Sequence, residues 1–412
     1  MMRLVERARA VVEQHESATK ARTRRRKEKD AENFGNAVDV MVSNLAHAVL
    51  MPPESGRLAF ATGNPLKGQS RYDNPALGKP VSGLLYSLEA CGMLTHYPSA
   101  TRGEASSFAP TGAFAHTVRA AGVTLSDFGK MPGEETIILS RKSRKGGPEL
   151  PGSYRERVIY PDQPGANALR REVATLNAFV SAADIAFMDD GHGPIDPHER
   201  LARRYFTMTD ADQEPRFDQC GRLYGGFWQN LNRRRRPGIR VAGEAVAVLD
   251  FASMFTRLAY AHVGEVPPPG DLYAIAGLEQ RRPIVKKAFS TLLFDNFARP
   301  RWPVEFVEDE NGTDPATFLP REWTVALFRR AVLDRHPALK PCFGKGLGYG
   351  LMFQESCILI RALDEMRTRG IIGLGLHDGM LVPVSRAEQA ARIMVEAGRE
   401  ITGTILPVGI TC

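Results

Sequence analysis

The spacing of apolar residues divides the chain into helices and short strands. One stripe at helical spacing predicts a helix over residues 34–49 that stops before Pro52-Pro53. A later predicted helix carries its apolar stripe on Leu169, Val173, Leu176 and Val180. Between them, residues 81–92 and 112–122 read as two more helices, and residues 95–111 read as two short strands around a polar turn.

The order of helix, two-stranded ribbon and helix within residues 81–125 is typical of a winged helix. Such a unit places one helix in the DNA major groove and its ribbon near phosphates. The pattern therefore predicts a DNA-binding unit, although any small α+β domain gives the same order of elements.

Two segments without regular periodicity follow. Residues 140–157 are basic and rich in Gly and Pro, which predicts a linker. The segment MDDGHGPIDPHER (residues 188–200) contains two Gly and two Pro residues, so we interpret it as a loop. A metal cluster around His192 and His198 is the less favoured alternative.

A strand and a hairpin in the second half of the chain each carry a conspicuous aspartate. The apolar run EAVAVLD ends at Asp250 and is followed by an amphipathic helix. A carboxylate at the end of a strand is well placed for a site, but it equally suits a helix cap. In GLGLHDGMLVPV (residues 373–384), Asp378-Gly379 between apolar runs predicts a tight β-hairpin. Asp378 is then either an ordinary turn residue or a metal ligand.

The helix predicted from RRPIVKKAFSTLLFDN (residues 281–296) begins with a cluster of cations. Arg281, Arg282 and Lys286 lie near its N-terminus, where the helix dipole helps to hold a triphosphate. Phe294 lies two four-residue steps beyond Lys286 and is suited to stacking on a base. The simpler alternative is a solvated basic turn followed by an aromatic core residue.

Composition narrows the class of protein. The chain has 412 residues, enough for two or more units with their own cores, and a net charge of +7 that favours a polyanionic partner. The five cysteines form no CxxC pair, which predicts a reducing cytosol and no disulfide framework. No apolar run approaches the ~20 residues of a membrane helix, and no signal peptide is recognisable. We therefore expect a cytoplasmic protein with no membrane partner. The basic run at residues 20–30 is either a solvated face or a nucleic-acid contact.

Four segments, in order, resemble the palm and fingers of the family A DNA polymerases and of the phage-type single-subunit RNA polymerases. GRLYGGFWQNL (residues 221–231) resembles the segment that precedes motif A in the DNA enzymes. Motif A is matched at Asp250, Phe251, Arg257 and Gly264. Motif B is matched at Arg282, Lys286 and Phe294, and Thr291 matches a Thr of the RNA enzymes. Motif C is matched at His377-Asp378.

The resemblance covers residues 215–412 and implies the role of each matching residue. It implies two Mg²⁺ ions, or Mn²⁺ in their place, held by Asp250, Asp378 and the Phe251 carbonyl. The implied catalytic residues are Asp250, Asp378 and Lys286. The expected nucleotide-binding residues are Arg281, Arg282, Lys286, Phe294 and Phe255. The expected nucleic-acid-binding residues are Arg222, Gln229, Asn230, Arg233, Arg234, Arg235, Arg257, Gln354 and His377, and we interpret His377 as orienting the hairpin.

Three positions depart from the DNA enzymes. Phe255 replaces the motif A Glu that helps to exclude the ribose 2′-hydroxyl, Asp295 replaces the final Gly of motif B, and Gly379 replaces the Glu of motif C. The choice between DNA and RNA synthesis therefore stays open.

Together these patterns predict an α+β protein with a right-hand polymerase palm, an antiparallel sheet with helices, and helical fingers. We expect a helical and basic region (1–75), a winged-helix-like unit (76–145), a linker with thumb-like helices (146–214), a palm (215–265 and 346–412), and fingers with an insertion (266–345). The predicted function is template-directed nucleotide transfer with DNA and nucleoside triphosphates as partners, most simply DNA synthesis for a plasmid, phage or mobile element. The alternatives are an RNA-synthesising primase and a non-catalytic replication initiator with a degenerate palm.

Overall fold

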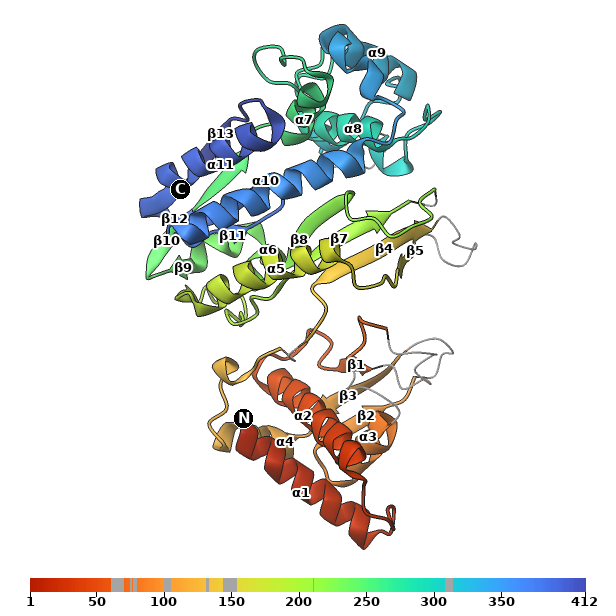
Figure 1. Cartoon of the computed structure of the whole chain (residues 1–412), viewed down its shortest axis with the longest axis vertical. Helices are drawn as coiled ribbons and strands as arrows, with labels where there is room; N and C mark the ends of the chain where they lie inside the picture. Colours follow the sequence, from red (N-terminus) through yellow and green to blue (C-terminus); the bar gives the residue numbers. More distant parts are fainter. Residues whose placement is uncertain are drawn as a thin grey trace. The chain divides into compact units, whose positions relative to one another are not determined.

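The chain folds into two compact units that contain helices and mainly antiparallel sheets (Figure 1). The computed structural model describes residues 1–60, 70–74, 76, 80–99, 105–130, 133–143, 154–209, 211–307 and 314–412. The N-terminal unit comprises residues 1–135 and 189–199, and the C-terminal unit comprises residues 136–188 and 200–412. Within the described residues, no helix has the length and hydrophobicity needed to cross a membrane.

The N-terminal unit packs four helices against a three-stranded sheet of order β1-β3-β2. Its elements are α1 (Met2–Ala18), α2 (Glu28–Leu50), β1 (Leu58–Phe60), α3 (Pro80–Ala90), β2 (Leu94–Tyr97), β3 (Ser106–Pro110), α4 (Gly112–Ala120) and η1 (Leu125–Asp127). The stripe predicted over residues 34–49 is the buried face of α2, and the helix–ribbon–helix order of residues 81–120 is confirmed. The middle of the predicted ribbon turn, residues 100–104, lies outside the described residues.

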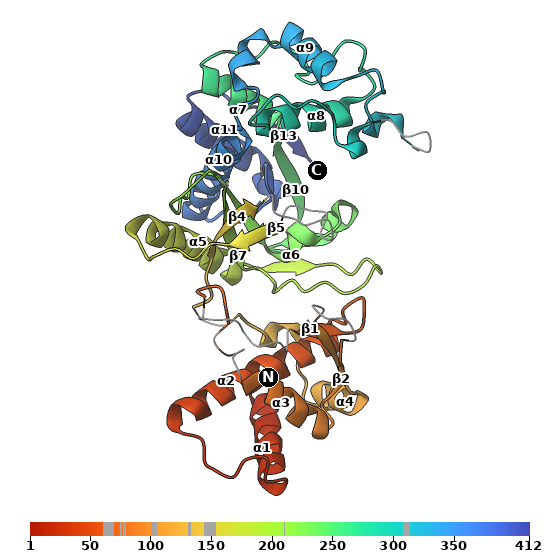
Figure 2. The ribbon, with the colours of Figure 1, turned by 90° about the vertical axis from the view of Figure 1, so that its right-hand side faces the viewer.

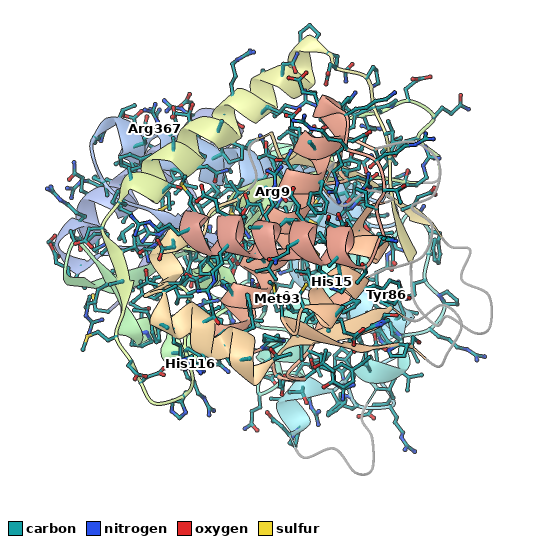
Figure 3. All side chains as sticks on the ribbon, turned by 90° about the horizontal axis from the view of Figure 1, so that it is seen from below. Arg9, His15, Tyr86, Met93, His116 and Arg367 are labelled. Atoms are coloured by element: carbon teal, nitrogen blue, oxygen red, sulfur yellow. The ribbon has the colours of Figure 1, made fainter. Side chains whose placement is uncertain are left out.

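Figure 3 shows side chains on the helices of this unit from below, with Arg9 and His15 on α1 and Tyr86 on α3.

The predicted loop at 188–200 contributes residues 189–199 to this unit and has no helix or strand. Asp196 of the loop contacts His47 of α2, with 3.1 Å between Oδ2 and Nε2. That contact fixes a loop that the sequence inserts between two strands of the other unit.

The C-terminal unit contains two sheets. Its elements are β4 (Ile137–Ser143), β5 (Tyr154–Arg157), α5 (Pro164–Ala182), β6 (Ile185–Phe187), β7 (Ala202–Met208), β8 (Cys220–Gly225), α6 (Phe227–Asn230), η2 (Arg233–Gly238), β9 (Ile239–Val241), β10 (Glu244–Phe251), α7 (Met254–Val263), α8 (Arg282–Phe294), η3 (Val304–Phe306), η4 (Pro315–Thr317), α9 (Val325–Arg335), η5 (Pro337–Cys342), α10 (Gly348–Thr368), β11 (Leu374–Gly375), β12 (Gly379–Pro383), η6 (Val384–Arg386), α11 (Ala387–Thr402) and β13 (Val408–Thr411). The sheet orders are β5-β4-β7-β8 and β11-β12-β10-β9-β6, and β13 also pairs with β10.

The linker predicted at residues 140–157 is wrong at both ends. Residues 140–143 belong to β4 and residues 154–157 to β5, and the two strands pair antiparallel. The Gly- and Pro-rich part, residues 144–153, lies outside the described residues. The composition of this segment does not indicate the strands, because β4 is also stabilised by parallel pairing with β7, which is distant in the sequence.

The helix α10 connects the two sheets of the C-terminal unit (Figure 2). It contacts β8 of one sheet, and it contacts α11, which packs on β10, β12 and β13 of the other. The buried Arg204 of β7 donates to the Gly221 carbonyl and to Ser356 Oγ of α10, at 2.8 and 3.3 Å. Because α10 contacts elements of both sheets, it holds the two sheets in a fixed position relative to each other.

Candidate functional site

Asp250 lies near the end of a strand that is paired on both sides. In β10, Ala247, Leu249 and Phe251 are buried, so alternation places the exposed Asp250 on the opposite face. The two residues opposite Asp250 on the neighbouring strands are Gly379 of β12 and Gly409 of β13. Because cross-strand neighbours share a face, two glycines leave the carboxylate uncovered.

The hairpin brings Asp378 to the same strand end. Leu376 N–H donates to the Gly379 carbonyl at 2.8 Å, so His377 and Asp378 form the two-residue turn between β11 and β12. The backbone N–H of Phe251 donates to the Asp378 carbonyl at 3.1 Å. The predicted hairpin is thus confirmed, and its turn is attached directly to the end of β10.

Gly379 is needed for a reason that differs from the sequence argument. The hairpin was predicted with Asp378 and Gly379 in its turn, but Gly379 lies in β12 and is not among the described glycines with positive φ. A Cβ at position 379 would overlap the Asp250 Oδ1 atom and the Leu249 carbonyl oxygen. The glycine therefore permits close approach of two strands at the site.

The short helix α6 anchors the hairpin. Trp228 Nε1 and Gln229 Nε2 of α6 each donate to the Gly375 carbonyl at 2.9 Å. The rings of Tyr224 and His377 lie 4.9 Å apart. Gln229, predicted to bind nucleic acid, is thus engaged by the backbone, and the position of His377 agrees with its interpretation as an orienting residue. Gln354 of α10 is half-buried, and Asn230 is exposed.

Opposing charges gather around the two carboxylates. Burial within the protein and repulsion from Asp378 raise the pKa of Asp250, while Arg233, Lys286 and Arg236 lower it. The side chain of Asp250 nevertheless keeps contact with solvent. Three cations therefore surround two carboxylates that repel each other. Such an arrangement is expected at a site that binds a charged ligand or ion.

Glu355 of α10 is a third carboxylate of the site. It is 1% exposed, and its Oε1 accepts from Arg222 Nε at 2.7 Å, whereas its Oε2 is buried with no partner within the described residues. Burial, with added repulsion from Asp378, raises its pKa to about 7 in spite of Arg222 and Lys286. Burial and the nearby Arg222 lower the pKa of His377. The sequence left open whether Gln354 and Glu355 are polar groups of the site or ordinary residues of the helix face, and only Gln354 was included in the predicted site.

Aromatic rings line the same region. The rings of Phe255 and Phe294 lie 5.8 Å apart, and the Arg222 guanidinium lies 5.7 Å from the centre of the Phe255 ring. Phe294 also meets Tyr349 edge-on at 5.3 Å. Lys286, Thr291 and Phe294 line a hollow of about 480 Å³ on one side of α8.

Other predicted residues have partners elsewhere. Arg282 forms an ion pair with Asp271, with 2.7 Å between Nε and Oδ2, and Arg281 donates to the Pro315 and Phe318 carbonyls. Arg257 donates to the Ala252 carbonyl at 2.9 Å, and the Arg235 guanidinium lies over the Phe187 ring. Arg234 is exposed. A triphosphate role for Arg281 and Arg282 would therefore require these contacts to break.

The oxygen donors at the strand end suit a hard cation. Asp250, Asp378 and the Phe251 carbonyl supply oxygen ligands of the kind that Mg²⁺ takes, and two carboxylates in proximity are stabilised by a divalent ion. No cluster of three or more His, Cys, Asp and Glu side chains in metal-binding range occurs among the described residues. The candidate metal centre consists of two side chains and a backbone carbonyl.

Comparison with known proteins adds no relative. The sequence matches no protein-family model, and no curated protein is significantly similar to it. The resemblance to polymerases therefore depends on the four segments and on where the structure places them.

We predict that Gly379→Ala perturbs the site and destabilises the fold by about 2–3 kcal/mol, because the added Cβ meets backbone and carboxylate atoms. Gly350→Ala is the matched control, since a Cβ there meets nothing within 4 Å and alanine favours the helix by up to about 1 kcal/mol. Urea unfolding of both variants measures the difference. Equal stability of the two variants would contradict the proposed close approach.

We also predict that Glu355 makes stability depend on pH. Its pKa is raised to about 7 from 4.5, so the native state binds a proton more tightly, and this contribution to stability decreases as pH rises between those values. Glu355→Gln removes the effect, so wild type should lose up to about 3 kcal/mol relative to the variant over this range. The free energies of unfolding of wild type and the variant, determined across this pH range without divalent ions, measure the difference. Glu388→Gln, at an exposed residue of α11, should give a curve parallel to that of wild type.

Proposed function

We propose that the C-terminal unit is a template-directed nucleotidyltransferase of the DNA-polymerase type, acting in replication of a plasmid, phage or mobile element. The observation that carries the proposal is the pairing of β10 with β12, which brings Asp250 and Asp378 to one strand end. The sequence separates these residues widely, and the fold joins them beside Lys286 and Arg222.

The reaction joins a strand's 3′-hydroxyl to the α-phosphorus of a nucleoside triphosphate. A bond forms between the hydroxyl oxygen and phosphorus, the bond to pyrophosphate breaks, and the hydroxyl proton passes to solvent. Bound Mg²⁺ ions, held by Asp250, Asp378 and the Phe251 carbonyl, would stabilise the attacking and leaving oxygens.

The chain's own cations perform the remaining electrostatic work. Lys286 extends from α8 and acts electrostatically on both Asp250 and Glu355. In this position its ammonium group neutralises charge that develops on the leaving pyrophosphate. Arg233 and Arg236, which also act electrostatically on Asp250, are suited to holding strand phosphates, and that attraction decreases with salt.

The aromatic pair supports a role in holding the nucleotide. Phe294 and Phe255 present ring surface beside Arg222, where a base or sugar can pack. Neither ring has a hydrogen-bonding group, so the pair favours selection by shape over selection by a polar contact. Whether the product is DNA or RNA is an outcome of the assay below.

The N-terminal unit is proposed to bind duplex DNA as a winged helix. Support comes from α3, which precedes the ribbon β2–β3, and from the β1-β3-β2 order. The outward side of α3 carries Gly83, Tyr86 and Ala90, and Tyr86 is 63% exposed. A helix with such a small, mostly uncharged surface is suited to entering a groove.

Primer extension tests the proposed reaction. Wild type, Asp250→Asn and Asp378→Asn are incubated with a primed DNA template, Mg²⁺, and either dNTPs or rNTPs. We expect extension by wild type and a loss by orders of magnitude in both variants, because each removes a charged ligand of the reaction centre. Asp364→Asn, at another carboxylate of the same unit, should retain activity.

Absence of extension by wild type with either nucleotide set, while template is still bound, would instead favour a non-catalytic replication initiator. Extension with rNTPs and no primer would favour a primase.

Lys286→Met tests the leaving-group role separately. We expect the single-turnover rate to fall about a hundredfold, with little change in affinity for primed template, since one stabilising charge is lost near the transition state. Lys287→Met is the neighbouring control, because the Lys287 ammonium lies over the Phe306 ring. Equal rates in the two variants would contradict the assigned role.

A further inference from the structure

The segment between α8 and α10 contains a second hollow. It has a volume of about 620 Å³ and is bounded by the end of α8, the loop at 297–300, α9, and η5. Asp295 and Arg299 line both this hollow and the one beside Lys286. These two residues form a bidentate ion pair, with 2.6 and 2.9 Å between nitrogen and oxygen, so the Arg299 charge is already neutralised.

The hollow combines an apolar floor with unpaired cations. Leu292, Val325 and Phe343 are buried side chains that line it. Arg329 and Arg330 of α9 and Lys340 of η5 also line it. Among the described residues, none of these three side chains forms a hydrogen bond or ion pair, and the Arg329 Nε is buried without a partner.

The charge balance of the lining favours an anion. Beyond the neutralised Arg299–Asp295 pair, the described lining residues contribute these three cations and one carboxylate, Asp334. Arginine forks match the geometry of phosphate oxygens, and cations left without partners at a concave surface attract an anionic ligand. A hollow of this size lies in the range of small-molecule sites.

We propose that this hollow binds a nucleotide unit, with its phosphate against Arg329, Arg330 and Lys340 and its base against the apolar floor. The choice of a nucleotide over another phosphate ester rests on the proposed function, because the adjoining hollow carries Lys286 and Phe294. The nucleotide comes either from an unpaired strand or from the free pool, and both sources have the same chemistry.

The test is binding of two probes without divalent ions, a fluorescent oligothymidylate and fluorescent AMP, measured by anisotropy. We expect the triple variant Arg329→Gln, Arg330→Gln, Lys340→Gln to bind one or both probes about tenfold more weakly or worse, with the oligonucleotide salt slope reduced by about 2. The control carries the same loss of charge at exposed sites, Arg171→Gln, Arg386→Gln, Arg392→Gln.

A second variant, Ala326→Trp, fills the hollow without changing charge and should weaken binding of the same probe. Thermal unfolding shows whether each variant is folded. If the variants bind only the oligonucleotide more weakly, the natural ligand is an unpaired strand. If they bind AMP more weakly, the natural ligand is a free nucleotide.

Affinities for both probes within twofold of the control in both folded variants would overturn the inference. Neither probe requires chemistry, so the outcome is independent of primer extension. If wild type extends no primer but the triple variant binds the probes more weakly, the proposed binding site stands and the proposed function does not. If wild type extends primers but the triple variant binds both probes normally, the proposed function stands and this binding site does not.

Discussion

The central constraint in the C-terminal unit is the approach of two carboxylates at the end of one strand. Asp250 and the Asp378 turn meet because β10 and β12 pair in a register that places Asp250 opposite Gly379. Any side chain at 379 would occupy the space of the Asp250 carboxylate. The pair is unfavourable by itself: burial and repulsion from Asp378 raise the pKa of Asp250, and Arg233, Lys286 and Arg236 offset only part of that rise.

The remaining architecture holds those strands and cations in place. Helix α10 carries Ser356 toward the buried Arg204 and Glu355 toward Arg222, so a single helix face ties the β7–β8 sheet to the site. A buried pair of this kind contributes little net stability but fixes geometry, because leaving either charge unpaired is strongly unfavourable. The consequence is that Arg222 is oriented over Phe255 by a residue that need not touch substrate.

Much of the fold follows from local sequence, whereas the contents of the site do not. The helices and the hairpin were predictable because apolar periodicity and Asp-Gly chemistry are local signals. The reason for Gly379 was not predictable, since it depends on a strand more than a hundred residues away. Arg281 and Arg282 look like phosphate ligands in the sequence, but Asp271 and the 315–318 carbonyls engage them in the fold. Glu355 could have been found, because its position on the apolar stripe of α10 marks a buried charge that needs a partner.

The charged residues of the chain are distributed unevenly between its two units. The C-terminal unit has 37 Lys and Arg against 29 Asp and Glu, whereas the N-terminal unit has 17 against 18. The positive net charge of the chain thus belongs to the unit with the paired carboxylates. Under the proposed function, long-range attraction of a polyanion would bring strand phosphates to Arg233 and Arg236. The N-terminal unit has no such excess, so the DNA binding proposed for it would depend on the fit of α3, with its exposed Tyr86, into a groove. If both units bind DNA as proposed, binding by the C-terminal unit would decrease with salt more steeply than binding by the N-terminal unit, because more of it depends on charge.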